Sequence, residues 1–142
     1  MTYGQLKGLC SSLLIGDTKL PMDNVKLLPL VDYGLQKIAM KADSLRLMTK
    51  NTAANIVRVA SNKQYIRKPN LPALDDDILD IDDELCYALA NFISGFLSKN
   101  KPKEFNNEAQ NIMNDFNSKV YDIIMGTEFD PASGDFKLWM IT

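Results

Sequence analysis

Ten consecutive residues near the middle of the chain carry seven carboxylates, from Asp75 to Glu84, and no basic residue. Carboxylates this close together could bind a divalent cation, but a calcium loop needs oxygen ligands at fixed offsets around a glycine. This run has no glycine and places apolar residues at ligand offsets. A two-metal phosphoryl-transfer site would need further acids, with Glu108, Asp115 and Asp122 as the candidates. We predict instead that the run mainly caps a helix and that the chain binds no metal.

The common catalytic residues are missing from the sequence. Histidine is absent, which removes the commonest general base and the commonest metal ligand. Cys10 and Cys86 have no CxxC partner and fall at apolar positions of expected helices, as buried thiols do. The seven glycines form no phosphate-binding loop. We expect a protein that is not an enzyme and has no cofactor; an enzyme using a lysine or paired carboxylates is the third-ranked alternative.

A basic segment precedes the acidic run. From Ser44 to Leu74 the sequence has six basic residues and no acid. The six are Arg46, Lys50, Arg58, Lys63, Arg67 and Lys68. Cations on a β-hairpin with Tyr65 among them could neutralise phosphates and stack a base. Contact with a neighbouring protein subunit is the other interpretation, and the acidic pI of about 5.1 favours it.

These residues must be positioned by helices and a small β-element. Apolar residues spaced by three or four predict helices at about 2–15, 23–42, 80–98 and 103–125. Pro29 falls in the second, which must either begin close to this proline or be kinked there. The sequence therefore predicts a mainly α fold, a bundle of about four helices.

Shorter segments complete the expected fold. Residues 44–68 change to strand-like composition and should form two or three short strands, as a hairpin or meander. A proline-containing connector follows at Lys68–Pro72. We expect one helical domain over residues 1–126, with this β insertion, and an extended C-terminal tail over 127–142.

The tail ends in a mostly apolar segment. Its apolar residues include Phe136, Leu138, Trp139 and Ile141. Either this strand folds back onto the sheet of its own chain, or it is an arm that pairs with an exposed edge on a neighbour. The latter would add these four residues to the six basic ones as candidate interface residues.

Composition limits the remaining possibilities. The length of 142 residues and the 46% hydrophobic content suit one compact globular domain. No apolar run approaches the ~18 residues needed to span a bilayer, and the N-terminal residues do not have the pattern of a signal peptide. We therefore expect no membrane partner, and the two cysteines, expected as buried thiols, indicate a reducing compartment.

Two segments resemble a known family. The apolar helix VKLLPLVDYGLQKI, from Val25 to Ile38, precedes the strand-rich basic segment, and DDILDI, from Asp76 to Ile81, follows it. This order resembles that of the head-to-tail adaptor proteins of tailed bacteriophages. The resemblance covers roughly residues 22–98. It implies a structural virion protein, assembled in the host cytoplasm, that forms a ring between portal and tail and extends the DNA channel. Its partners would be further copies of itself, the portal protein, tail proteins, and DNA passing through without sequence-specific binding.

The distribution of charge is consistent with such a ring. Residues 1–70 hold eleven basic residues against four acidic ones, about +7, and residues 71–142 hold five against fourteen, about −9. In a ring, one face of a subunit meets a different face of the next. Complementary charges on the two faces set the register of such a contact. The alternative function is a small nucleic-acid-binding or regulatory helical protein that uses the basic 44–68 hairpin.

Overall fold

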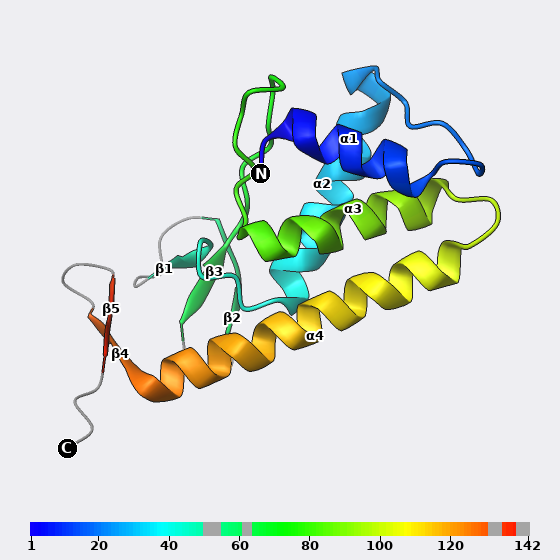
Figure 1. Ribbon diagram of the computed structural model, residues 1–142. Helices are drawn as coiled ribbons and strands as arrows, with labels where there is room; N and C mark the ends of the chain where they lie inside the picture. Colours follow the sequence, from blue (N-terminus) through cyan, green and yellow to red (C-terminus); the bar gives the residue numbers. More distant parts are fainter. Residues whose placement is uncertain (50–54, 61–63, 131–134, 139–142) are drawn as a thin grey trace.

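The described part of the chain forms four helices and five short strands in the computed structural model (Figure 1). The structure describes residues 1–49, 55–60, 64–130 and 135–138, with side chains described as far as residue 120. The elements are α1 (Tyr3–Leu13), α2 (Asn24–Lys41), β1 (Met48–Thr49), β2 (Ile56–Val59), β3 (Tyr65–Arg67), α3 (Asp83–Leu97), α4 (Pro102–Gly126), β4 (Thr127–Asp130) and β5 (Asp135–Leu138). The predicted mainly α fold is confirmed, and each expected helix is present to within a few residues.

Helix α1 begins with a capping box. The amide of Gln5 donates to Oγ1 of Thr2 at 3.2 Å, and the amide of Thr2 donates to Oε1 of Gln5 at 2.9 Å. Both otherwise unpaired donors at the start of the helix are thereby satisfied. The buried face of α1 carries Tyr3, Leu6 and Cys10, which hold the helix against α3.

Helix α2 starts well before its proline. Asp23 caps it, accepting a hydrogen bond from the Val25 amide at 3.0 Å. Pro29 therefore lies inside the helix, and the alternative in which the regular helix begins close to this proline is wrong. Because proline has no N–H, one backbone hydrogen bond of the ladder is lost there. The ring is accommodated on the exposed side of the helix.

Helix α3 is the centre of the core. Ten of its fifteen residues are buried, from Leu85 to Gly95 with Tyr87 excepted, so it is covered on most of its circumference, as expected of a helix that is apolar nearly all round. α4 packs antiparallel along it (Figure 1). A Cβ added at Gly95 would lie 3.2 Å from the carbonyl oxygen of Pro102. The close approach between the end of α3 and the start of α4 therefore requires glycine.

The small sheet has β3 in the middle. Its order is β1-β3-β2, and both pairings are antiparallel. The expected hairpin is therefore β2–β3, and β1 joins it on the far side of β3 rather than in meander order. Leu47 and Ile66 are fully buried and anchor the sheet to the helices.

The predicted connector is the first part of a longer segment, residues 68–82, that links the sheet to α3 and runs back to the beginning of the chain; we call this whole segment the connector. The amide of Tyr3 donates to the carbonyl of Asp77 at 2.8 Å, and the amide of Gly4 donates to that of Asp75 at 2.9 Å. Leu79 and Ile81 are buried in the core. The connector thus closes over the N-terminal end of α1 (Figure 1).

The C-terminal segment forms a second, separate sheet. Strands β4 and β5 pair antiparallel, with Phe129 opposite Phe136 and Thr127 opposite Leu138. Figure 1 shows this hairpin at the far end of α4, away from the helical body. The expected tail strand is therefore paired with its immediate neighbour in the chain and not with the β1–β3 sheet.

Candidate functional site

Two arginines of the basic segment converge on a single carboxylate. Arg67 donates from Nη1 to Oδ2 of Asp80 at 2.5 Å and from Nη2 to Oδ1 at 2.8 Å. Arg46 lies with Nε 3.4 Å from the same Oδ1, and the Asn70 amide donates to Oδ2 at 2.8 Å. A bidentate arginine–carboxylate pair fixes geometry as well as charge. Asp80 therefore ties the sheet to the connector.

The surroundings of Asp80 favour its charged form. Burial of the carboxyl opposes ionisation, but hydrogen bonds from Arg67 and from the Asn70 amide outweigh it, so that the pKa of Asp80 lies below its usual value. The same hydrogen bond raises the pKa of Arg67. Both groups of the pair are therefore charged at neutral pH.

Arg58 is bonded at the end of α2. Its Nε donates to the Ala39 carbonyl at 2.9 Å, and Nη2 donates to the Ala42 carbonyl at 2.6 Å and to Oδ1 of Asp43 at 2.9 Å. The carbonyls at a helix C-terminus lack intrahelical partners and carry partial negative charge. Arg58 satisfies them from strand β2.

The four basic candidates in the described part of the chain do not form one open basic face. Arg46 and Arg67 meet at Asp80, Arg58 lies apart at α2, and Lys68 is exposed. Lys50 and Lys63 lie outside the described residues. The three arginines thus bond within their own chain, and their contact with a partner stays a prediction.

Capping of α3 accounts for only part of the acidic run. Asp83 and Glu84 lie in the first turn, where negative charge is favourable. Asp82 is the N-cap residue, but its side chain makes no cap hydrogen bond; it accepts from Oγ of Ser44 at 2.5 Å. The run thus also holds the segment that precedes β1.

The beginning of the run holds the connector in place. Oδ2 of Asp77 accepts from the amides of Ala73 and Leu74, each at 2.8 Å. These bonds lower the pKa of Asp77. Asp75 forms an ion pair with Lys7 of α1 at 2.7 Å. Within the described residues, no group of three or more His, Cys, Asp or Glu side chains could hold a metal ion.

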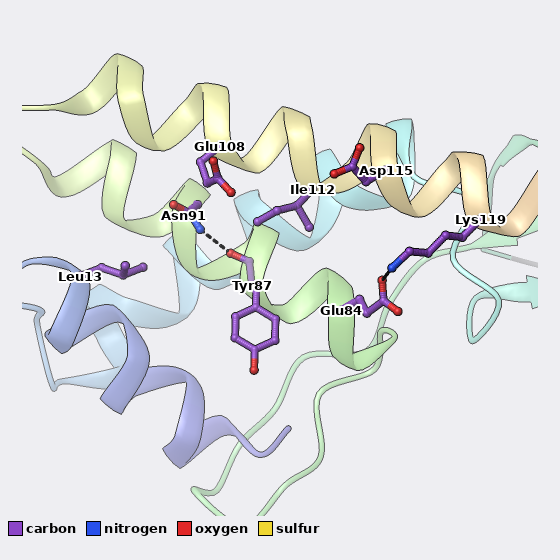
Figure 2. Close-up of a pocket in the computed structure, with 8 residues that line it drawn as sticks. All are labelled: Leu13, Glu84, Tyr87, Asn91, Glu108, Ile112, Asp115 and Lys119. Carbon is purple, nitrogen blue, oxygen red and sulfur yellow. Dashed lines mark hydrogen bonds and ion pairs between the residues drawn. The ribbon is translucent and has the colours of Figure 1, made fainter.

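A groove of about 500 Å³ lies between α1, α3 and α4 (Figure 2). Its lining residues are Leu13 of α1, Glu84, Tyr87 and Asn91 of α3, and Glu108, Ile112, Asp115 and Lys119 of α4. Tyr87 is half exposed, and the Asn91 amide nitrogen donates to its carbonyl at 2.8 Å. Pockets of this size with an apolar floor are typical binding sites for ligands and segments of other proteins.

The rim of this groove is acidic. Lys119 pairs with Glu84 at 3.0 Å across one end, as the dashed line in Figure 2 shows. Glu108 and Asp115 are exposed, and none of the described side chains forms an ion pair with either. The groove therefore carries two carboxylates available for a cationic partner.

Three apolar side chains of α2 are exposed on the side of the helix that is turned away from the core. Val25 is 80% exposed, Met40 56% and Tyr33 45%. The ring of Tyr33 lies 6.0 Å from that of the exposed Phe96, and the ammonium group of Lys37 lies 4.9 Å from the Tyr33 ring centre. Aromatic and methionine side chains are enriched where proteins meet. We call Val25, Tyr33 and Met40 the outer α2 face.

The predicted apolar tail residues are only partly placed. Phe136 and Leu138 lie on β5, and Trp139 and Ile141 lie outside the described residues. The pairing of β5 with β4 leaves both outer edges of this hairpin without a partner strand among the described residues. The alternative in which this strand joins the sheet at 44–68 is wrong for β5, and its pairing with an edge on a neighbour stays a prediction.

The groove and the outer α2 face were not predicted from the sequence. A signal for the groove exists, because Glu108, Ile112, Asp115 and Lys119 recur at spacings of three and four on one side of the last helix. Which neighbours flank that side depends on tertiary packing.

Comparison of the chain with protein-family models, with curated proteins and with solved structures finds no match in any of the three. None of the helices in the described part of the chain is long and apolar enough to cross a membrane.

Proposed function

We propose that the chain is a structural virion protein of a tailed bacteriophage, which forms a head-to-tail adaptor ring between the portal and the tail and extends the DNA channel. Its partners are further copies of itself, the portal protein and tail proteins, and DNA passes through the ring without sequence-specific binding. The resemblance of residues 22–98 to adaptor proteins is the starting point of this proposal.

The observation that carries the proposal is the β4–β5 hairpin at the end of α4. A lone two-stranded hairpin is marginal in water, and this one packs on the rest of the chain mainly through α4. Its edges have no partner strand in the described structure, so a neighbouring chain could add to them. Unpaired strand edges would give an adaptor subunit a further means of joining its neighbours.

The test is assembly in the presence of a portal ring. The purified chain is mixed with the portal protein encoded in the same genome, and the mixture is studied by light scattering and negative-stain electron microscopy. We expect rings of this protein on one end of the portal. A chain that stays monomeric, both alone and with the portal, would contradict the proposal.

Nucleic-acid binding by the basic hairpin is the alternative from the sequence, and the structure gives it no added support. Arg46, Arg58 and Arg67 are bonded to carboxylates and carbonyls of their own chain. Binding that weakens steeply with salt and is lost on replacing Arg58, Lys63 and Arg67 would favour it. Absence of detectable binding at low salt would exclude it.

A further inference from the structure

We propose that two copies of this chain meet through the outer α2 face of one copy and the α1–α3–α4 groove of the next. This inference rests on the proposed function and names the subunit contact that the ring would use. It is argued from the exposure of α2, from the charges around both surfaces and from their positions on the molecule.

The first argument is that α2 exposes three large apolar side chains on the side turned away from the core. Its inner side buries Leu27, Val31 and Leu35, and its outer side exposes Val25, Tyr33 and Met40 beside the partly exposed Asp32 and Gln36. Exposed apolar patches of this kind mark sites of protein contact. The outer α2 face is therefore expected to be covered in the assembled state.

The second argument is that the charges around the two surfaces are mainly opposite, with Asp32 on the outer side of α2 and Lys119 on the groove rim as the exceptions. Two lysines flank the outer α2 face: Lys26 directly follows Val25, and Lys37 lies four residues after Tyr33. Neither forms an ion pair with a described side chain. Across the molecule, Glu108 and Asp115 rim a groove whose floor contains Tyr87 and Ile112. Apolar centres with complementary charged rims are the usual composition of a specific interface.

The third argument is that the two surfaces lie on opposite sides of α3. Leu89 faces α2, because a Cβ added at Gly34 would lie 2.5 Å from its Cδ1. Tyr87 lines the groove, and residues two apart on a helix point about 200° apart. Figure 2 accordingly shows the groove in front of α3 and α2 passing behind it. Because the surfaces are different and face apart, their contact is head-to-tail and repeats from copy to copy, closing into a ring when the rotation allows.

A charge exchange tests the contact. One variant of the full chain carries Lys26→Glu and Lys37→Glu, a second carries Glu108→Lys and Asp115→Lys, and a third carries all four substitutions. We expect each double variant to self-associate about tenfold or more weakly than the wild type, because like charges then face one another. The quadruple variant should regain association, and so should an equal mixture of the two double variants.

The control is a variant with Lys101→Glu and Lys103→Glu. It makes the same change in net charge as the variant with Lys26→Glu and Lys37→Glu, at exposed positions beyond both surfaces, so it should associate like the wild type. Circular dichroism checks that every variant is folded, and sedimentation velocity measures association over a concentration series, alone and with the portal ring.

The outcomes separate the two proposals. If the wild type assembles and neither double variant is weakened, or if both are weakened and the quadruple variant is not restored, the assignment of this contact is wrong while the adaptor function stands. A wild type that never assembles, with or without the portal, would overturn the adaptor function and the contact together.

Discussion

Arg67 and Asp80 form a bidentate ion pair between β3 and the connector, with both guanidinium Nη atoms on the two carboxylate oxygens at 2.5 and 2.8 Å. Only 12% of the Asp80 side chain is exposed, so solvent screens the pair less than it would on an open surface. The pair joins β3, in the basic half of the sequence, to Asp80, in the acidic half.

Replacing Asp80 should be costly for stability. Asp80→Ala leaves Arg67 and the Asn70 amide without their acceptor, and we expect a loss of about 2–3 kcal/mol in the free energy of unfolding. Urea denaturation followed by circular dichroism measures it. Asp76→Ala is the matched control in the same run, because Asp76 is exposed and should change stability by no more than about 0.5 kcal/mol. Equal effects of the two substitutions would contradict the role given to Asp80.

Stability should fall in acid, partly through the same residue. The pKa of Asp80 is lower in the folded protein than the value of about 3.9 expected in the unfolded chain. Above the unfolded-chain pKa, the contribution of Asp80 to the free energy of unfolding is complete. This contribution is lost as the pH falls through the pKa of Asp80 in the folded protein.

The urea midpoint of the wild type should therefore decrease from about pH 5 downward. Asp80→Asn should show a smaller decrease, since it lacks this titrating group. Three other carboxylates, Asp17, Asp77 and Asp83, also have lowered pKa values. They should account for the decrease of the urea midpoint that remains in Asp80→Asn. Identical pH slopes for wild type and Asp80→Asn would count against this account.

Two glycines should respond oppositely to alanine. At Gly95 a new Cβ would lie 2.9 Å from Oδ1 of Asn106 and 3.2 Å from the Pro102 carbonyl oxygen, so Gly95→Ala should destabilise the protein by about 1–3 kcal/mol. At Gly8, which is exposed in α1, a Cβ would meet nothing within 4 Å. Gly8→Ala should stabilise by about 0.5–1 kcal/mol. Thermal melts of both variants decide this, and stabilisation by Gly95→Ala would show that the α3–α4 approach is looser than described.

Both cysteines should be inert while the protein is folded. Burial raises the pKa of Cys10 to about 12 and that of Cys86 to about 11, and the thiolate is the reactive form. Iodoacetamide at pH 8 should therefore label neither residue at a rate faster than unfolding. Mass spectrometry follows the labelling, with the urea-unfolded chain as the positive control. Rapid labelling of either thiol in the native protein would be inconsistent with its burial.

The helices could be predicted from sequence because each one carries its own apolar period. Leu85, Leu89 and Ile93 repeat at four-residue spacing and lie on the buried side of α3. The Thr2–Gln5 capping box and the Asp23 cap are likewise local features. Such signals require no knowledge of the rest of the fold.

The remaining features depend on contacts between distant residues. Strand composition marks β1, β2 and β3, but their order follows from which edge β1 reaches after the turn at 44–47. Seven acids in one run look alike in sequence, and only the return of the connector brings Asp80 to Arg67 and Asp75 to Lys7. The groove exists because α1 and α4 flank the same side of α3, which no local pattern reports.

The attachment of α1 to the connector has a consequence for how the chain folds. Tyr3 and Gly4 bond to Asp77 and Asp75, which are more than seventy residues later in the sequence. A contact of such large sequence separation requires closure of a long loop and forms slowly. During synthesis, the first helix must therefore wait without its final partners until the connector and α3 have left the ribosome.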